Sequence, residues 1–120
     1  MPDRPKNVVI LGSTGSIGES ALKVARDIPD RMRVVGLAAN RSEEKLAGQL
    51  TEWGIKEGCL ADSTRLDDCL RQAPAGTHLR SGEDGLVELA TLPEADMVLI
   101  AIVGTAGLRP ALAAIEAGKD

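Results

Sequence analysis

Aromatic residues are nearly absent from this chain. Trp53 is the only one among 120 residues, and there is no phenylalanine or tyrosine. The apolar content therefore consists almost entirely of alanine, valine, isoleucine and leucine, which suits a parallel sheet flanked by helices. Trp53 falls at helical spacing with Leu46 and Leu50, so we expect it in or beside the core rather than as a platform for stacked bases.

Blocks of lysine and arginine are also missing, and the formal net charge is −4. This balance argues against nucleic acid as the main partner. No apolar run is long enough to span a membrane, and residues 1–6 lack the apolar core of a secretory signal. We therefore expect no membrane association and a cytoplasmic location, for one small domain or part of a larger protein.

Reactive and metal-ligating residues are scarce. Cys59 and Cys69 do not form a C-x-x-C motif and have no histidines clustered around them. Two buried, reduced thiols are expected from this spacing, instead of a disulfide or a metal site. His78 is the only histidine, and without a visible partner it is expected on the surface rather than as a general base. Three aspartates are best explained as helix caps and solvated charges, not as metal ligands: Asp62, Asp67 and Asp68.

The most informative stretch is an apolar run at residues 7–11 followed by glycines at every third position, Gly12, Gly15 and Gly18. A buried strand, a glycine-rich turn and an amphipathic helix form the context of a dinucleotide-binding motif, here in the variant G-x-x-G-x-x-G. Gly12 would allow the tight turn, Gly15 the approach of a pyrophosphate, and Gly18 close packing of helix and strand. The helix N-terminus would then face the phosphates. The alternative is a glycine-rich turn without a ligand.

The end of the second predicted strand bears on the choice of cofactor. Enzymes specific for NAD usually place an acid there, whereas this chain has Asn40, Arg41 and Ser42. Arg41 would attract a 2′-phosphate through charge-assisted hydrogen bonds worth about 1.5–3 kcal/mol, which is roughly one to two decades of preference for NADPH over NADH. Alternatively, Arg41 is solvated and Ser42 is the N-cap of a helix that begins with Glu43 and Glu44. Both roles can coexist.

Apolar periodicity predicts alternating strands and helices, and hence an α/β fold: a Rossmann-like three-layer sandwich with a mostly parallel sheet. Strands are expected at residues 7–11, 33–39, 57–61 (weak), 77–82 (a short strand or an extended connection) and 95–103, and helices at 16–28, 42–53, 62–72, 83–90 and 108–118. The expected apolar residues of three helices are Ile17, Ala21, Val24, Ala25 and Ile28, then Leu66, Cys69 and Leu70, then Leu108, Leu112, Ala114 and Ile115.

A second glycine-bearing turn follows the strand at 95–103. In an open α/β sheet the carboxyl end of such a strand is the ligand edge, next to the switch in strand order. Gly104 could let the nicotinamide half of a cofactor lie against the backbone. An equally good interpretation is an ordinary strand-to-helix turn with Thr105 as its N-cap.

Three segments together resemble the amino-terminal domain of the 1-deoxy-D-xylulose 5-phosphate reductoisomerase family: residues 10–18, 33–40 and 101–108. Residues 112–119 fit the same family, so the likeness covers essentially the whole chain. It implies an enzyme that isomerises 1-deoxy-D-xylulose 5-phosphate and reduces it with NADPH to 2-C-methyl-D-erythritol 4-phosphate, on the methylerythritol phosphate route to isoprenoids. It also implies a sugar-phosphate substrate, a divalent metal (magnesium or manganese), and a homodimer of the longer protein.

The resemblance implies that residues 14–17 meet the cofactor phosphates, residues 40–42 the adenosine ribose and its 2′-phosphate, and residues 101–104 the cofactor from the neighbouring strand. In the family, the turn that corresponds to residues 40–42 often contains Gly-Lys-Asn or Gly-Arg-Asn. This chain has Asn40-Arg41-Ser42 there, so it keeps only the positively charged residue, Arg41. Together with the glycine motif, the candidate cofactor-binding residues are Gly12, Thr14, Gly15, Ser16, Ile17, Gly18, Asn40, Arg41, Ser42, Ala101 and Gly104.

The family's metal-binding acids, substrate contacts and lid match no residue here. Residues 1–120 are therefore expected to be an NADPH-binding domain, a fragment with no catalytic or metal-binding residues of its own and no turnover. Two alternatives stay open: the cofactor domain of another two-domain NADPH reductase, such as a semialdehyde dehydrogenase, or a stand-alone nucleotide-binding module.

Overall fold

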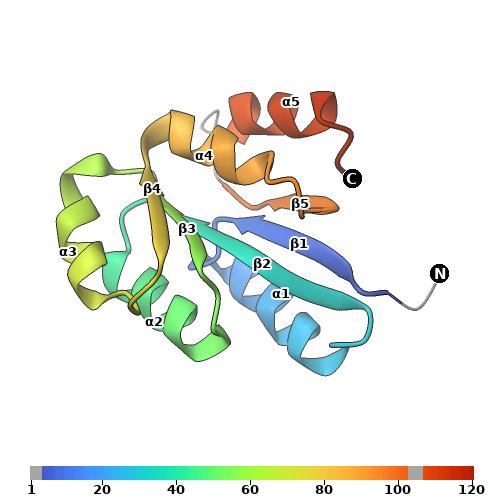
Figure 1. The fold of residues 1–120 in the computed structure, drawn as a ribbon, viewed down its shortest axis with the longest axis horizontal. Coiled ribbons are helices and arrows are strands. Elements are labelled where there is room, and N and C mark those ends of the chain that lie inside the picture. The colour runs from blue at the N-terminus through green and yellow to red at the C-terminus, as the bar shows by residue number, and fades with distance from the viewer. Residues whose placement is uncertain (1–3, 103–106) are drawn as a thin grey trace.

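The computed structural model describes residues 4–102 and 107–120, which form a parallel sheet with helices on both faces (Figure 1). The strands are β1 (Lys6–Leu11), β2 (Met32–Ala39), β3 (Glu57–Leu60), β4 (His78–Ser81) and β5 (Met97–Ile100). The helices are α1 (Ser16–Asp27), α2 (Glu43–Trp53), a short 3₁₀ turn η1 (Ser63–Arg65), α3 (Leu66–Gln72), α4 (Gly82–Ala90) and α5 (Leu108–Glu116). The predicted α/β fold is confirmed, and all strand pairs among the described residues are parallel.

The strand order is β4-β3-β2-β1-β5. Because β1 pairs with β2 on one side and with β5 on the other, the direction of strand succession reverses at β1. In open parallel sheets the crevice at the carboxyl ends of the strands flanking such a reversal is the usual ligand position. The fold therefore places the turn after β1 and the segment after β5 at the expected ligand edge.

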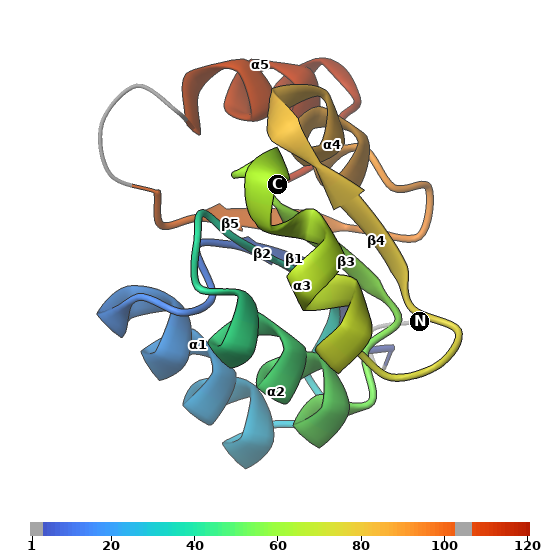
Figure 2. The ribbon, with the colours of Figure 1, turned by 90° about the vertical axis from the view of Figure 1, so that its left-hand side faces the viewer.

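Strand β1 lies at the centre of two apolar clusters. Val8 and Ile10 contribute to the cluster under α1, α2 and α3, while Val9 and Leu11 contribute to the one under α4 and α5. Figures 1 and 2 show these two helical layers on opposite faces of the sheet. Successive side chains of a strand point to opposite faces, and all four residues are at most 1% exposed. The continuous apolar run in the sequence thus marks a strand buried on both faces, as predicted.

The predicted inward face of α1 is partly wrong. Ile17 and Val24 are 64% and 50% exposed, whereas Gly18, Leu22 and Ala25 form the buried face. The reason lies at the start of the helix, where Gly18 packs against the turn that leaves β1. Because Gly18 faces inward, the residues one and two turns later on the same helix face, Leu22 and Ala25, also face the sheet.

Two other helices also depart from prediction. In α5 the small residues Pro110 and Ala114 face the core, and the larger Leu108, Leu112 and Ile115 are exposed. In α3 Cys69 is buried as expected, but Leu70 is 45% exposed. Of the strand expected at 95–103, the described residues 95–102 form β5 only at Met97–Ile100, since these four residues are the ones paired with β1, and residue 103 lies outside the described ranges. None of the helices in the described ranges has the length and apolar content needed to cross a membrane.

Both cysteines are free thiols and fully buried, as predicted. Burial raises the pKa of Cys59 to about 12, against a smaller lowering effect of Arg80. Burial also raises the pKa of Cys69, whose thiol lies 3.6 Å from the carbonyl oxygen of Glu43. Because the thiolate is the reactive form, both groups are chemically protected in the folded chain.

We predict that a thiol-specific reagent such as Ellman's reagent modifies neither cysteine in native buffer at pH 8, because both thiols are protonated and out of reach. Denaturation in guanidinium should release two reactive thiols at once, so the unfolded chain is its own control. Rapid labelling of either thiol under native conditions would contradict the burial described above.

Candidate nucleotide-binding site

The turn after β1 is tied to both neighbouring strands. The backbone N–H groups of Gly12 and Ser13 both donate to the carbonyl oxygen of Ala38, at 2.8 and 2.9 Å. Ala101 N–H donates to Leu11 at 2.7 Å. Gly12 has a positive φ of 97°, and a Cβ there would lie 2.6 Å from the carbonyl oxygen of Ala101. The ends of β1, β2 and β5 therefore meet with no room for a side chain at Gly12.

Gly18 and Gly15 differ sharply in their surroundings. A Cβ on Gly18 would lie 2.2 Å from the Gly12 carbonyl oxygen and 2.6 Å from Cα of Ser13. Gly18 is thus required by the packing of α1 onto the turn. A Cβ on Gly15 would meet only the Gly12 oxygen, at an ordinary 3.7 Å, and its φ of −82° is available to any residue. The described residues give no packing reason for a glycine at position 15.

The N-terminus of α1 has no side-chain cap, since Gly15 occupies the N-cap position. Within the described ranges, the backbone N–H groups of Ser16, Ile17 and Gly18 have no carbonyl acceptor. Unpaired N–H groups at the positive end of a helix are well suited to bind an anion. The exposed Ile17 side chain does not change this, because the group that matters there is its N–H.

A cavity of about 250 Å³ lies beside this turn and is lined by Gly12, Thr14, Gly15, Ala38, Ala39, Asn40, Ala61, Leu86, Ala101 and Ile102. It brings together residues that follow β1, β2, β3 and β5. A larger hollow of about 560 Å³ lies at the opposite edge, near Trp53 and the start of β2. Ligands of open parallel sheets bind at the carboxyl ends of the strands, so the smaller cavity is the candidate site.

Helix α2 holds the turn in place from the side. The fully buried Ser13 donates through its hydroxyl to Gln49 Oε1 at 2.7 Å, and Gln49 Nε2 donates to the Ser13 carbonyl oxygen at 2.9 Å. Lys45 Nζ, one helical turn earlier, donates to the Thr14 carbonyl oxygen at 3.2 Å. These contacts were not predicted from the sequence. The only sequence signal was the spacing of Lys45 and Gln49, four residues apart on one helix face.

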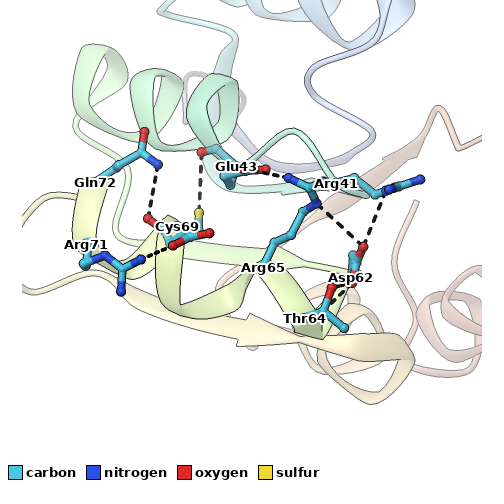
Figure 3. A network of polar contacts seen from close by, with 9 residues as sticks. Arg41, Glu43, Asp62, Thr64, Arg65, Cys69, Arg71 and Gln72 are labelled. Carbon is cyan, nitrogen blue, oxygen red and sulfur yellow. Dashed lines mark hydrogen bonds and ion pairs between the residues drawn. The ribbon is translucent and has the colours of Figure 1, made fainter.

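The loop after β2 carries the candidate cation. Arg41 is largely exposed, and its Nε lies 3.5 Å from Oδ2 of Asp62, the second residue after β3 (Figure 3). Two hydrogen bonds from Thr64 lower the pKa of Asp62, and the bond from its hydroxyl has a larger effect than the bond from its N–H. The charges of Arg41 and Arg65 lower this pKa by smaller amounts. Ser42 does precede α2, as predicted, but its hydroxyl forms no capping hydrogen bond.

The predicted site residues can now be placed. Gly12, Thr14, Gly15, Asn40 and Ala101 line the cavity. Ser16, Ile17 and Gly18 form the first turn of α1, and Arg41 and Ser42 lie in the loop before α2. Gly104 and the alternative cap Thr105 lie outside the described residues. The cofactor roles of these residues stay predictions.

The other polar residues singled out from the sequence lie elsewhere or serve the fold. His78 is exposed on β4 and lies 3.5 Å from Glu57. Asp62 caps η1 by accepting from the Thr64 N–H, as expected for a cap. Across residues 4–102 and 107–120, no group of three or more histidine, cysteine, aspartate or glutamate side chains is placed to hold a metal ion.

A sequence profile of the 1-deoxy-D-xylulose 5-phosphate reductoisomerase family matches residues 8–120. The chain belongs to this family. It is 47% identical over 114 residues to the reductoisomerase of Anaeromyxobacter sp. (strain K), and 43% identical over 122 residues to that of Dechloromonas aromatica (strain RCB). The matches cover 95% and 99% of this chain but 29% and 31% of those relatives, so the chain spans less than a third of their length.

Solved reductoisomerase structures share the fold closely. The enzyme of Zymomonas mobilis in complex with NADPH superposes with a TM-score of 0.88 at 38% identity, over 97% of this chain and 31% of that one. A reductoisomerase in complex with NADPH, fosmidomycin and magnesium gives 0.89 at 36% identity, over 95% and 28%. Family membership therefore favours the reductoisomerase interpretation over a semialdehyde dehydrogenase or a stand-alone module.

The contrast among the glycines leads to a stability prediction. Gly18→Ala should destabilise the chain by about 1–3 kcal/mol or more, because the new methyl group meets backbone atoms that cannot move aside. Gly48 lies in the middle of α2 on its solvent-exposed side, and a Cβ there would have no atom within 4 Å. The control Gly48→Ala should stabilise by about 0.5–1 kcal/mol, as alanine does in helices. Guanidinium unfolding measures both; equal effects of the two substitutions would contradict the packing at Gly18.

Proposed function

We propose that this chain is the NADPH-binding part of a 1-deoxy-D-xylulose 5-phosphate reductoisomerase. The whole enzyme would isomerise 1-deoxy-D-xylulose 5-phosphate and reduce the product to 2-C-methyl-D-erythritol 4-phosphate in isoprenoid biosynthesis. The observation that carries the proposal is the geometry after β1. There a helix N-terminus without a side-chain cap opens beside a cavity at the point where strand order reverses.

Gly15 fits the pyrophosphate of the cofactor. Its missing side chain serves no packing purpose among the described residues, so the empty position is available to a ligand that must approach the backbone. The N–H groups of residues 16–18 supply donors and the helix dipole favours negative charge. Thr14 and Ser16 add hydroxyl groups on either side of Gly15, which are suited to the same phosphate oxygens.

The position of the pyrophosphate determines where the adenosine and nicotinamide ends of the cofactor would lie. The adenosine ribose would lie toward Asn40, Arg41 and Ser42 at the end of β2, with the 2′-phosphate facing Arg41. The nicotinamide would lie on the other side of the turn, toward Ala101 and Gly104 after β5. NADPH is the bound cofactor of two solved relatives, and a cation in place of an acid at the end of β2 agrees with that choice.

The remaining requirements of the reaction concern the whole protein. Magnesium is present in solved relatives, but the described residues of this chain offer it no cluster of ligands, and we assign it none here. For the whole protein we propose a sugar-phosphate substrate, a homodimer and a cytoplasmic location.

Titration with NADPH and NADH tests the cofactor assignment. The parent chain should bind NADPH more tightly by roughly one to two decades, the size of a charge-assisted contact to the 2′-phosphate. Arg41→Ala should lose most of that preference and leave NADH binding unchanged. Arg31→Ala, which removes an exposed arginine at the opposite end of β2, is the matched control and should behave like the parent. Equal affinity of the parent for both coenzymes would contradict the role of Arg41.

We also predict that this chain by itself does not catalyse the reductoisomerase reaction. It spans less than a third of its relatives, and none of its described residues is assigned to the substrate or the metal. Mixed with 1-deoxy-D-xylulose 5-phosphate, NADPH and magnesium, it should leave the absorbance at 340 nm constant. Loss of absorbance that depends on the sugar phosphate would show that the chain carries catalytic residues which we have not recognised.

A further inference from the structure

Two arginines share one carboxylate at the ends of β2 and β3. Oδ2 of Asp62 lies 3.5 Å from Arg41 Nε and 4.0 Å from Arg65 Nε. Figure 3 shows Arg41 and Arg65 approaching this oxygen from different elements, the loop after β2 and the turn η1. Both guanidinium groups thus lie within hydrogen-bonding or ion-pair range of a single anionic atom.

The carboxylate is held in this position by its own turn. Oδ1 of Asp62 accepts hydrogen bonds from the N–H and the hydroxyl of Thr64, which leaves Oδ2 directed at the arginines. Arg65 is held in addition by Nη1, which donates to Oε1 of Glu43 at 3.0 Å. The side chains of Arg41 and Arg65 are nevertheless 66% and 41% exposed, so an anion from solvent can reach both.

We propose that Arg65 and Asp62 set the coenzyme preference of the site together with Arg41. Arg65 is a second cation for the 2′-phosphate, and Asp62 occupies the space between the two guanidinium groups and opposes the phosphate. The inference rests on the proposed function, because it concerns the 2′-phosphate of the same cofactor. A phosphate monoester carries up to two charges and three acceptor oxygens, and it is a better ligand for two guanidinium groups than one carboxylate oxygen.

The signs of the two effects follow from the charges. Removing the charge of Arg65 weakens attraction to the 2′-phosphate and has no counterpart in NADH, which has a hydroxyl there. Removing the charge of Asp62 relieves repulsion of the same phosphate. Asparagine at position 62 still accepts from Thr64, so the turn is kept. Glutamine at position 65 removes the charge and keeps an amide N–H donor on a shorter side chain.

The first test compares Arg65→Gln with the control Arg71→Gln by titration of each chain with NADPH and NADH. Arg71 is an exposed arginine in the last turn of α3, paired with Asp68. We expect Arg65→Gln to bind NADPH roughly tenfold more weakly and NADH unchanged, and Arg71→Gln to match the parent. Unchanged NADPH binding by Arg65→Gln, or equal weakening of both coenzymes, overturns the role of Arg65.

The second test compares Asp62→Asn with Asp68→Asn. We expect Asp62→Asn to bind NADPH several-fold more tightly and NADH as before, with the gain shrinking at high salt because exposed charges are screened. Weaker NADPH binding by Asp62→Asn, with a thermal unfolding midpoint equal to the parent's, overturns the opposing role of Asp62.

Binding of neither coenzyme by the parent chain would overturn the proposed function itself, and the inference with it. A preference for NADPH that is lost in Arg41→Ala but kept in Arg65→Gln and unchanged in Asp62→Asn would overturn the inference alone.

Discussion

Gly18 packs directly against the backbone of the turn that precedes α1, and the placement of the helix and of the candidate site follows from this contact. Because a Cβ at that position would lie 2.2 Å from a carbonyl oxygen, α1 can start directly against the end of β1. This contact decides which side of α1 faces the sheet, and it places the N-terminus of α1 beside the cavity, whose lining includes the N-cap residue Gly15. The candidate site thus results from packing of backbone on backbone.

Helix α2 links the two halves of the proposed cofactor site. It begins directly after Arg41 and Ser42, and farther along it holds the glycine turn through Lys45 and Gln49. The loop that would bind the ribose and the turn that would bind the pyrophosphate are therefore connected by one rigid element. The segment after β3 is attached to the same loop, since the N–H of Asp62 donates to the carbonyl oxygen of Asn40.

Much of the fold could be predicted because its signals are local. The apolar run of β1, the glycine spacing, the end of α2 at Trp53 and the burial of both cysteines follow from residue type and short-range geometry. The inward faces of α1 and α5 could not be predicted with the same success. Each helix offers two apolar stripes, and the choice depends on which neighbour it meets: the turn after β1 for α1, and α4 with the edge strand β5 for α5.

The local chemistry of the site follows from neighbouring residues in the chain: a glycine turn between a buried strand and a helix, and a cation where an acid would favour NAD. The identity of the distant residues around the site depends instead on how the strands are arranged in the sheet. Parallel strands bring their carboxyl ends to one edge of the sheet, and the order β3-β2-β1-β5 makes Asp62, Arg41, Gly12 and Ala101 neighbours. Residues that follow different strands have no fixed spacing in the chain, so no sequence pattern could have shown that Arg65 lies close to Arg41.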